Sequence, residues 1–214
     1  MSATAINLAR VTSATVVSYD RSMGRWEPNA RGRLLEAAFA LYGERGFEQT
    51  TVAEIAERAG LTERTFFRHF ADKREVLFAG ADALRKLMIS TVAQAPGSLA
   101  PIDAAAAGLE AAGALIQEGG ELPRQRQAII DASSELQERE LVKLATLASA
   151  LTDALRLRGV EDRVASLAAE AAIAVFKIAF VRWINANDQR DLPRGIRESF
   201  DELKTLTSAG APAG

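Results

Sequence analysis

Apolar residues between positions 34 and 78 recur at helical spacing, interrupted by breaks that divide this stretch into short helices. The first stripe predicts a helix that ends at Gly46 and Phe47, with its inward residues at Leu35, Ala38, Phe39 and Tyr42. The second stripe predicts a shorter helix, with its inward residues at Val52, Ile55, Ala56 and Ala59. Helices this short bury their apolar faces only against one another, so we expect a three-helix core.

Polar residues indicate where the short helices begin. Thr51 and Glu54 have the spacing of a capping box, in which each side chain bonds the backbone N–H of the other residue. Gly60 follows the second stripe and is expected to adopt a left-handed conformation that turns the chain. Thr62 then caps the next helix, so two short helices are predicted with a tight turn between them.

The helix after Thr62 has an apolar side and a polar side. The residues expected to face inward are Thr65, Phe66 and Phe70. The residues expected on the outside or at the rim are Glu63, Arg64, Phe67, Arg68 and His69. After this helix, Asp72 and Glu75 predict a second capping box, which starts another helix and places Lys73 at its exposed N-terminus.

Residues 31–78 resemble the N-terminal DNA-binding domain of a tetracycline-repressor (TetR) family transcriptional regulator. The resemblance lies in the order of features: a helix ending in GF, then TTVxEIAxxAG, then TFFRHF, then a lysine opening the next helix. It implies an all-α fold, with an N-terminal helix-turn-helix DNA-binding domain and a C-terminal helical ligand-binding and dimerisation domain. We expect a tail at 1–30, the DNA-binding domain at 31–75, the C-terminal domain at 76–208 and a second tail at 209–214.

The resemblance also implies how DNA is contacted. The second helix of the motif enters the major groove, where Arg64 and Arg68 are the residues expected to reach base edges, because an arginine bonds guanine bidentately. Contacts to the phosphate backbone are expected from Thr51, Thr62, Thr65, His69 and Lys73. Phe67 stands where the family usually has tyrosine, so its ring either contacts a thymine methyl group or packs. Glu63 is a candidate acceptor for cytosine N4.

Each of these residues also has a purely structural interpretation. A threonine at a helix start is often only a cap, an exposed arginine is often only solvated, and His69 can be a packed histidine bonded to the backbone. The combination of caps, spacing and apolar stripes favours DNA binding.

Charge is distributed unevenly along a chain whose net charge is -2. Residues 62–74 carry four basic side chains against two acidic ones, whereas the chain beyond residue 75 is slightly acidic. Arg25, Arg31 and Arg33 precede the first helix, and we expect them to form an arm that follows the minor groove or neighbouring phosphates. Residues 1–22 are rich in Ser, Thr and Ala, and a misplaced start codon or an appended tail explains them as well as a functional arm does.

Composition argues against an enzyme or a metalloprotein. The chain has no cysteine and a single histidine, so thiol nucleophiles, zinc fingers and histidine-rich metal sites are not available, and no cofactor is expected. The 214 residues contain no uninterrupted apolar run of 18 residues and no secretory leader pattern, which predicts a cytoplasmic protein without a membrane partner.

Beyond residue 75 we expect four or five further helices, separated at 96–101, 119–123, 158–161 and 187–193. Residues 164–186 are apolar almost all round and predict a buried helix, and a second apolar face follows residue 193. In the resembled family the last two helices form a four-helix dimer interface. The corresponding dimerisation residues are Ile173, Phe180, Ile184, Ile196, Phe200 and Leu203.

The ligand-binding part of the prediction has two alternatives. Small residues at 104–114 either let helices pack closely and leave no cavity, or border an aliphatic cavity for an apolar or amphipathic ligand. The candidate ligand-binding residues are Met88, Phe176, Lys177, Phe180 and Trp183. Lys177 interrupts an apolar segment. We expect its side chain either to extend to solvent or to pair across the dimer with an acid such as Glu170, in preference to binding an anionic ligand.

The sequence thus predicts a homodimeric repressor that binds a palindromic DNA operator and releases it when a small molecule binds. The alternative is a helical dimeric protein-interaction module that lacks an inducer or has a vestigial helix-turn-helix.

Overall fold

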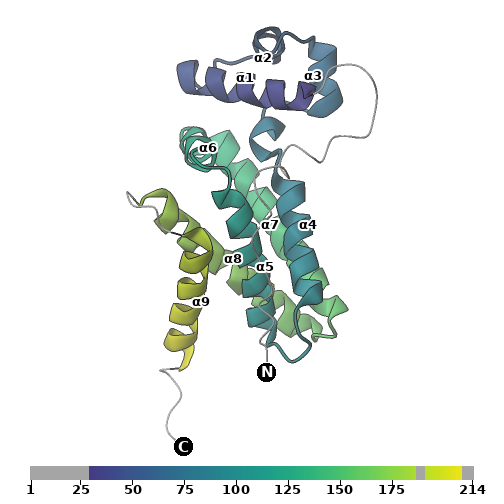
Figure 1. The fold of residues 1–214 in the computed structure, drawn as a ribbon, viewed down its shortest axis with the longest axis vertical. Helices are drawn as coiled ribbons and strands as arrows, with labels where there is room; N and C mark the ends of the chain where they lie inside the picture. The colour runs from purple at the N-terminus through teal and green to yellow at the C-terminus, as the bar shows by residue number, and fades with distance from the viewer. Residues whose placement is uncertain (1–28, 187–190, 209–214) are drawn as a thin grey trace, which may run out of the picture.

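In a computed structural model of the protein, residues 29–186 and 191–208 are described, and this part of the chain is helical, without strands (Figure 1). The N-terminal unit contains α1 (Ala30–Arg45), α2 (Val52–Arg58), α3 (Glu63–His69) and the 3-10 helix η2 (Glu75–Phe78). The C-terminal unit contains α4 (Ala81–Gln94), α5 (Pro101–Gln117), α6 (Leu122–Asp131), α7 (Ser134–Leu157), α8 (Asp162–Ile184) and α9 (Leu192–Ser208).

The N-terminal unit forms the predicted three-helix core. Its side chains meet between α1, α2 and α3, where Leu34, Leu41, Ile55 and Phe66 are almost completely buried. The predicted inward positions Ala38 and Tyr42 are buried, but Leu35 and Phe39 are only half-buried. The stripe that faces the core is therefore rotated by about one residue from the predicted one.

The predicted caps of α2 and α3 are confirmed. Thr51 and Glu54 form both bonds of a capping box, and the Thr62 hydroxyl accepts from the Thr65 backbone N–H. Gly60 has a φ of 65°, the left-handed conformation expected at the turn.

Only one half of the second predicted capping box forms. Asp72 accepts from the Glu75 backbone N–H at 3.1 Å, but the Glu75 carboxylate turns away and bonds Arg139 and Lys143 of α7. The segment that follows is one turn of 3-10 helix, and α4 begins only at Ala81. Two cations outside the segment are stronger partners for a carboxylate than one backbone N–H, which explains the difference.

The four predicted breaks in the C-terminal unit correspond to the ends of helices, although residues 187–190 within the last break lie outside the described residues. A further break at Ala132 and Ser133 separates α6 from α7, so this unit has six α-helices in the described part of the chain instead of four or five. No Gly or Pro marks this break. Ser133 has extended backbone, and its buried hydroxyl donates to Glu48 of the N-terminal unit at 3.0 Å.

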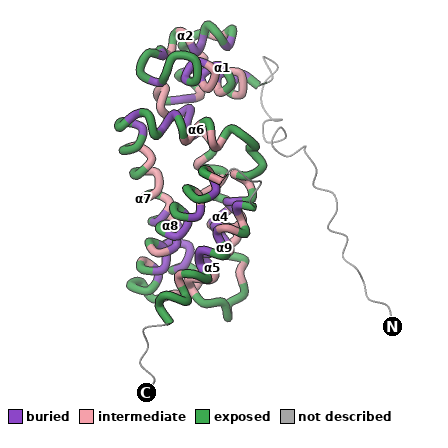
Figure 2. The backbone as a smooth tube through the Cα atoms, turned by 90° about the vertical axis from the view of Figure 1, so that its left-hand side faces the viewer, coloured by how far each residue is buried: buried purple, intermediate pink, exposed green. Residues whose placement is uncertain are grey.

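The described residues form two separate hydrophobic cores. One fills the C-terminal unit between α4, α5, α7, α8 and α9, and the other fills the N-terminal unit (Figure 2). The N-terminal core continues beyond residue 75 through η2 and takes in Ile129 and Ile130 of α6 and Leu136 of α7. The corner between α6 and α7 therefore packs with the N-terminal unit, although it belongs to the C-terminal one by sequence.

Helix α8 is not buried all round, contrary to expectation. One side packs against α5, α7 and α9, but Leu167 and Val181 are 73% and 55% exposed on the other side. The helix is long and apolar enough to cross a membrane by length and composition alone, and its position in the protein core accounts for much of that apolar character. Lys177 lies on the exposed side, so the charge predicted within a buried segment is in contact with solvent.

The predicted arginine arm is wrong for two of its three residues. Arg31 and Arg33 lie in the first turn of α1, and both side chains bond backbone carbonyls of the N-terminal unit. Arg25 lies in 1–28, and the predicted C-terminal tail lies in 209–214, both outside the described residues.

Candidate nucleic-acid interface

Helix α3 presents a polar, positively charged face to solvent. Phe66 and Phe70 are buried under the helix, and Arg64 and Arg68 on its opposite side are exposed. The aromatic anchors fix the rotation of the helix about its axis. The two guanidinium groups therefore project from a rigid element, one helical turn apart.

The remaining residues predicted on α3 surround these arginines. Thr62 and Glu63 are exposed, and Thr65 and His69 are half-buried at the rim. Phe67 is 54% exposed, and its ring meets Phe66 edge to face, with 5.5 Å between ring centres. An exposed phenylalanine held in this way offers a flat apolar surface beside the arginines, suited to a methyl group or to a sugar.

Arg33 of α1 holds the turn between α2 and α3. Its guanidinium donates to the carbonyl oxygens of Ala59 and Gly60, at the end of α2 and in the turn itself. Arg31 donates to Ala79 at 2.8 Å, and its guanidinium lies 5.4 Å from the centre of the Phe70 ring. The basic side chains of the first turn of α1 thus fix the geometry of the motif.

The start of α2 is also held rigidly. The exposed Thr51 bonds Glu54 through both its backbone N–H and its hydroxyl, at 2.9 Å each, and these bonds lower the pKa of the Glu54 carboxyl. Arg45 of α1 pairs with the other oxygen of Glu54 at 2.7 Å. Thr51 thus lies at a fixed position on the same unit as α3.

Lys73 is not at an exposed helix start, as the sequence predicted. Its side chain is half-buried, and its ammonium group donates to the carbonyl oxygens of Phe47 at 2.9 Å and Thr50 at 3.0 Å. The helix that Lys73 was expected to open does not form there, because η2 begins two residues later.

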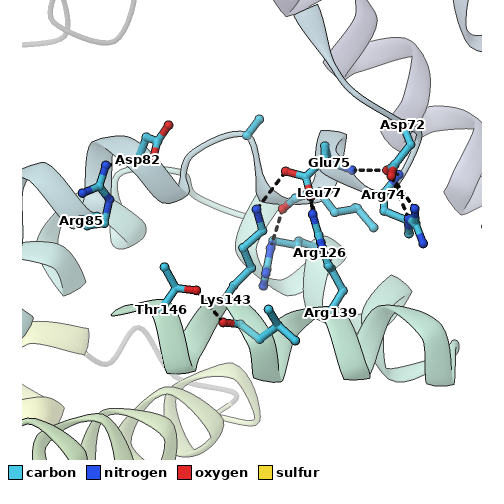
Figure 3. Close-up of polar contacts among 12 residues, drawn as sticks. Asp72, Arg74, Glu75, Leu77, Asp82, Arg85, Arg126, Arg139, Lys143 and Thr146 are labelled. Carbon is cyan, nitrogen blue, oxygen red and sulfur yellow. Dashed lines mark hydrogen bonds and ion pairs between the residues drawn. The ribbon is translucent and has the colours of Figure 1, made fainter. Parts of the chain in front are cut away.

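A cluster of charged residues joins the N-terminal unit to α7 (Figure 3). Glu75 points toward α7, where it accepts from Lys143 at 2.9 Å and from the Arg139 Nε at 2.9 Å. Burial, the largest influence, raises the pKa of Glu75, but the bonds from Lys143 and Arg139 outweigh it and lower the pKa overall. Glu75 is therefore held ionised, as a bridge between the two units.

Arg126 of α6 makes a second connection at the same place. It donates to the Leu77 carbonyl at 2.8 Å and to Glu140 at 3.0 Å, and its guanidinium lies 5.0 Å from the centre of the Phe78 ring. Burial lowers the pKa of Arg126, whereas the charge of Glu140 raises it. Sequence reasoning missed Glu75, Arg126, Arg139 and Lys143 as a group, because their spacing along the chain carries no motif.

Comparison with known proteins agrees with this arrangement, since residues 34–79 match the family described as bacterial regulatory proteins, tetR family. The chain therefore carries a TetR-family domain at residues 34–79. It is 33% identical over 89 residues to the transcriptional regulator TcmR of Streptomyces glaucescens, a match covering 42% of this chain and 39% of TcmR. It is 47% identical over 47 residues to the transcriptional repressor KstR2 of Mycobacterium tuberculosis, covering 22% of this chain and 24% of KstR2.

The fold of a solved repressor extends over the C-terminal unit as well. The structure of SmeT, repressor of a multidrug efflux pump of Stenotrophomonas maltophilia, has been solved in complex with triclosan. That complex superposes with a TM-score of 0.60 and 23% identity, over 83% of this chain and 90% of that chain. The likeness shows a shared fold, while the sequence matches span less than half of the length of the curated relatives.

The candidate ligand-binding residues are divided between the C-terminal core and the surface. Met88, Phe176 and Trp183 are buried in the C-terminal core, Phe180 is half-buried, and Lys177 is exposed on the outer side of α8. Small residues do bring α4 and α5 close together, because a Cβ on Gly108 would lie 2.8 Å from Val92 and 3.0 Å from the Met88 carbonyl. These distances favour the predicted close packing at 104–114.

A groove of about 630 Å³ lies between α8 and α9. Trp183 and Ala179 contribute apolar surface, and most of the other lining residues are charged or polar: Arg182, Asp191, Arg194, Glu198, Ser199 and Glu202. Arg182 pairs with Glu202 at 2.8 Å across the groove. This lining is more polar than the aliphatic cavity that the sequence predicted.

The predicted dimerisation residues largely occupy the chain's own core. Ile173, Ile196 and Phe200 are buried within one protomer, while Phe180, Ile184 and Leu203 are half-buried against it. Their apolar stripe on α9 faces α5 and α8, and the outer side of α9 is charged. On the opposite side of α8, four large apolar residues are exposed: Val164, Leu167, Ile178 and Val181.

Proposed function

We propose that this protein is a sequence-specific DNA-binding transcriptional regulator that acts as a homodimeric repressor. The observation that carries the proposal is the position of Arg64 and Arg68, exposed on a helix whose opposite side is anchored by buried phenylalanines. A helix-turn-helix unit with two arginines on its outer face suits the major groove. The relatives described as transcriptional regulators and repressors support the same function.

In this proposal, base edges are read from α3. Arg64 and Arg68 bond guanine, Phe67 contacts a thymine methyl group or a sugar, and Glu63 accepts from cytosine N4. Phosphate groups are contacted by Thr51, Thr62, Thr65 and His69, all of which lie on or beside the exposed surface. Lys73, which the resemblance adds to this group, is considered separately below.

A homodimer follows from the need to read a palindrome with two copies of α3. The exposed side of α8 supports this, because it carries four large apolar residues together with Glu170 and Lys177. Glu170 and Lys177 lie two turns apart. In an antiparallel pair of α8 helices, the acid of one protomer is level with the lysine of its partner.

We also propose control by a small molecule, as the fold shared with the SmeT–triclosan complex supports. The groove between α8 and α9 has the volume of a typical ligand site. Its paired charges favour a ligand that combines a ring, to lie against Trp183, with polar groups. Release of DNA then requires that the ligand bind more tightly to the conformation that does not fit the operator.

The first test selects DNA from a random duplex pool with the purified protein and measures affinity for the selected duplex over a series of salt concentrations. We expect a palindrome. Arg68→Ala should lose roughly 1–3 kcal/mol of discrimination at one base pair in each half-site.

Lys86→Ala is the matched control, because it removes one positive charge from an exposed position on α4, outside both α3 and the exposed side of α8. It should leave specificity unchanged. Two outcomes would contradict the proposal and favour a protein-interaction module with a vestigial motif. One is that no DNA sequence is selected, and the other is that DNA affinity falls with salt concentration but is the same for Arg68→Ala as for the wild-type protein.

A further inference from the structure

The loop between α1 and α2, residues 46–50, is closed by its own hydrogen bonds. The Thr50 side chain is completely buried, and its hydroxyl donates to the Gly46 carbonyl at 2.8 Å. The Thr50 backbone N–H donates to the Phe47 carbonyl oxygen at 3.2 Å. The Phe47 ring packs edge to face on Tyr42, with 5.4 Å between ring centres. Thr51 comes directly after this loop, so the position of the loop sets the position of Thr51.

Lys73 reaches this loop from the segment after α3. Its ammonium group donates to the carbonyl oxygens of Phe47 and Thr50, and the Glu48 carbonyl oxygen lies 3.4 Å away. The same ammonium group lies 4.3 Å from the centre of the Phe47 ring. The Tyr42 hydroxyl donates to the Lys73 carbonyl at 2.7 Å, which also fixes the lysine backbone. Burial raises the pKa of Tyr42, with a further contribution from Asp72, so the phenol keeps its proton for this bond.

We infer that Lys73 is a positioning residue, which holds the 46–50 loop and through it Thr51, and does not itself contact a phosphate group. An ammonium group has three N–H donors, and the carbonyls of Phe47, Thr50 and Glu48 surround it on the side of the loop. Reaching outward to a phosphate would break these bonds and lose the Phe47 ring contact. The inference rests on the proposed DNA binding and departs from the role that the family resemblance implies for this lysine.

The dependence of DNA affinity on salt separates the two roles. Each phosphate that a cation neutralises adds about 0.9 to the slope of the logarithm of affinity against the logarithm of salt concentration. We expect Lys73→Met to weaken operator binding on the order of tenfold, about 1.4 kcal/mol, with an unchanged salt slope. A slope reduced by about one for each lysine lost would overturn the inference.

Lys73→Arg tests the same point from the opposite direction and keeps the charge. A phosphate contact accepts arginine readily, whereas the compact space between three carbonyls and a ring does not accommodate a planar guanidinium group. Lys73→Arg should therefore weaken binding about as much as Lys73→Met, and full retention of affinity would contradict a positioning role. If Lys73→Met fails to fold, the arginine variant still decides between the roles.

A measurement without DNA keeps this inference separate from the proposed function. Hydrogen exchange of the backbone amides at 46–51 should become faster in Lys73→Met, while the amides of α5 keep their wild-type rates. Unchanged exchange in the loop would overturn the inference whether or not the protein binds DNA. Failure of the wild-type protein to select any DNA would count against the proposed function alone.

Discussion

Glu75 of η2 accepts a hydrogen bond from Lys143 of α7 at 2.9 Å, across the boundary between the two units of the protein (Figure 3). Arg139 bonds the other oxygen of the same carboxylate, and Arg74, next in sequence, pairs with Glu135 of α7 at 2.7 Å. A ligand that shifts α7 would therefore displace η2 and, with it, α3. These ion pairs form a direct physical connection between the proposed ligand-binding and DNA-binding units.

We expect Glu75→Gln to destabilise the protein by about 1–2 kcal/mol at pH 7, because two cations at the boundary lose a charged acceptor. The pKa of Glu75 lies below its ordinary value of 4.5 in the folded protein. The stabilisation is therefore complete above pH 4.5 and is lost as the pH falls through the folded pKa. Urea unfolding of both proteins between pH 7 and pH 3 measures the difference, which should shrink only below about pH 4.5.

Asp82→Asn provides the matched control. Asp82 pairs with Arg85 at 3.4 Å in the same region, but its side chain is 83% exposed, and an exposed pair of this kind contributes little. A loss in Glu75→Gln no larger than in Asp82→Asn would mean that the boundary ion pairs do not hold the two units together.

The turn of the helix-turn-helix gives a second prediction. Gly60 has a φ of 65°, and a Cβ at this position would lie 2.6 Å from the Arg33 guanidinium. Gly60→Ala should cost about 1–2 kcal/mol for the left-handed backbone, and more if Arg33 is forced away from the carbonyls it bonds. Gly120→Ala is the control, because Gly120 has a φ of 60° and no atom within 4 Å of the added Cβ.

Chemical denaturation measures both glycine variants. We expect Gly60→Ala to lose more stability than Gly120→Ala. Equal losses would show that only the backbone conformation matters and that Arg33 adjusts without cost.

Local chemistry explains which parts of this fold were predictable. The Thr51–Glu54 box, the Thr62 cap and the Gly60 turn depend on residues within four positions of one another, and all three predictions are confirmed. The exposed side of α3 was predicted equally well from the sequence, because two buried phenylalanines define which side faces inward. Whether these side chains contact DNA as proposed stays a prediction.

Predictions that depended on distant parts of the chain were wrong or incomplete. Lys73 and Glu75 have local patterns of a helix start, but carbonyls 23 residues away and cations more than 60 residues away compete for them. The break before α7 involves a bond between Ser133 and Glu48, 85 positions apart. Helix α8 carries large apolar residues on every side, so its sequence alone does not show which side faces the chain's own core and which remains exposed.

Close contact between α4 and α5 gives a third prediction. A Cβ on Gly108 would lie 2.8 Å from the Val92 side chain, so Gly108→Ala should destabilise the C-terminal unit by about 1–3 kcal/mol through overpacking. In Gly43→Ala, by contrast, the new Cβ meets its nearest neighbour at 3.5 Å, and we expect no loss or a small gain. Thermal unfolding of the two variants makes the comparison. If the clash is with Val92, Gly108→Ala should cost less in a Val92→Ala background than in the wild-type protein.

The exposed side of α8 gives the last prediction, which concerns the proposed dimer. Leu167 is 73% exposed, and we expect Leu167→Glu to place a carboxylate among the apolar residues of each half of the interface. Two desolvated charges should weaken dimerisation by roughly 100-fold or more, and light scattering after size-exclusion chromatography measures the fraction of monomer.

Leu157→Glu provides the control for the dimer. Leu157 is 87% exposed at the end of α7 and lies outside the α8 face, so this variant should remain dimeric. A monomeric wild-type protein would contradict the dimer itself. A Leu167→Glu protein that stays dimeric at nanomolar concentration would mean that the protomers meet through another surface, and that the charged outer side of α9 is the next one to test.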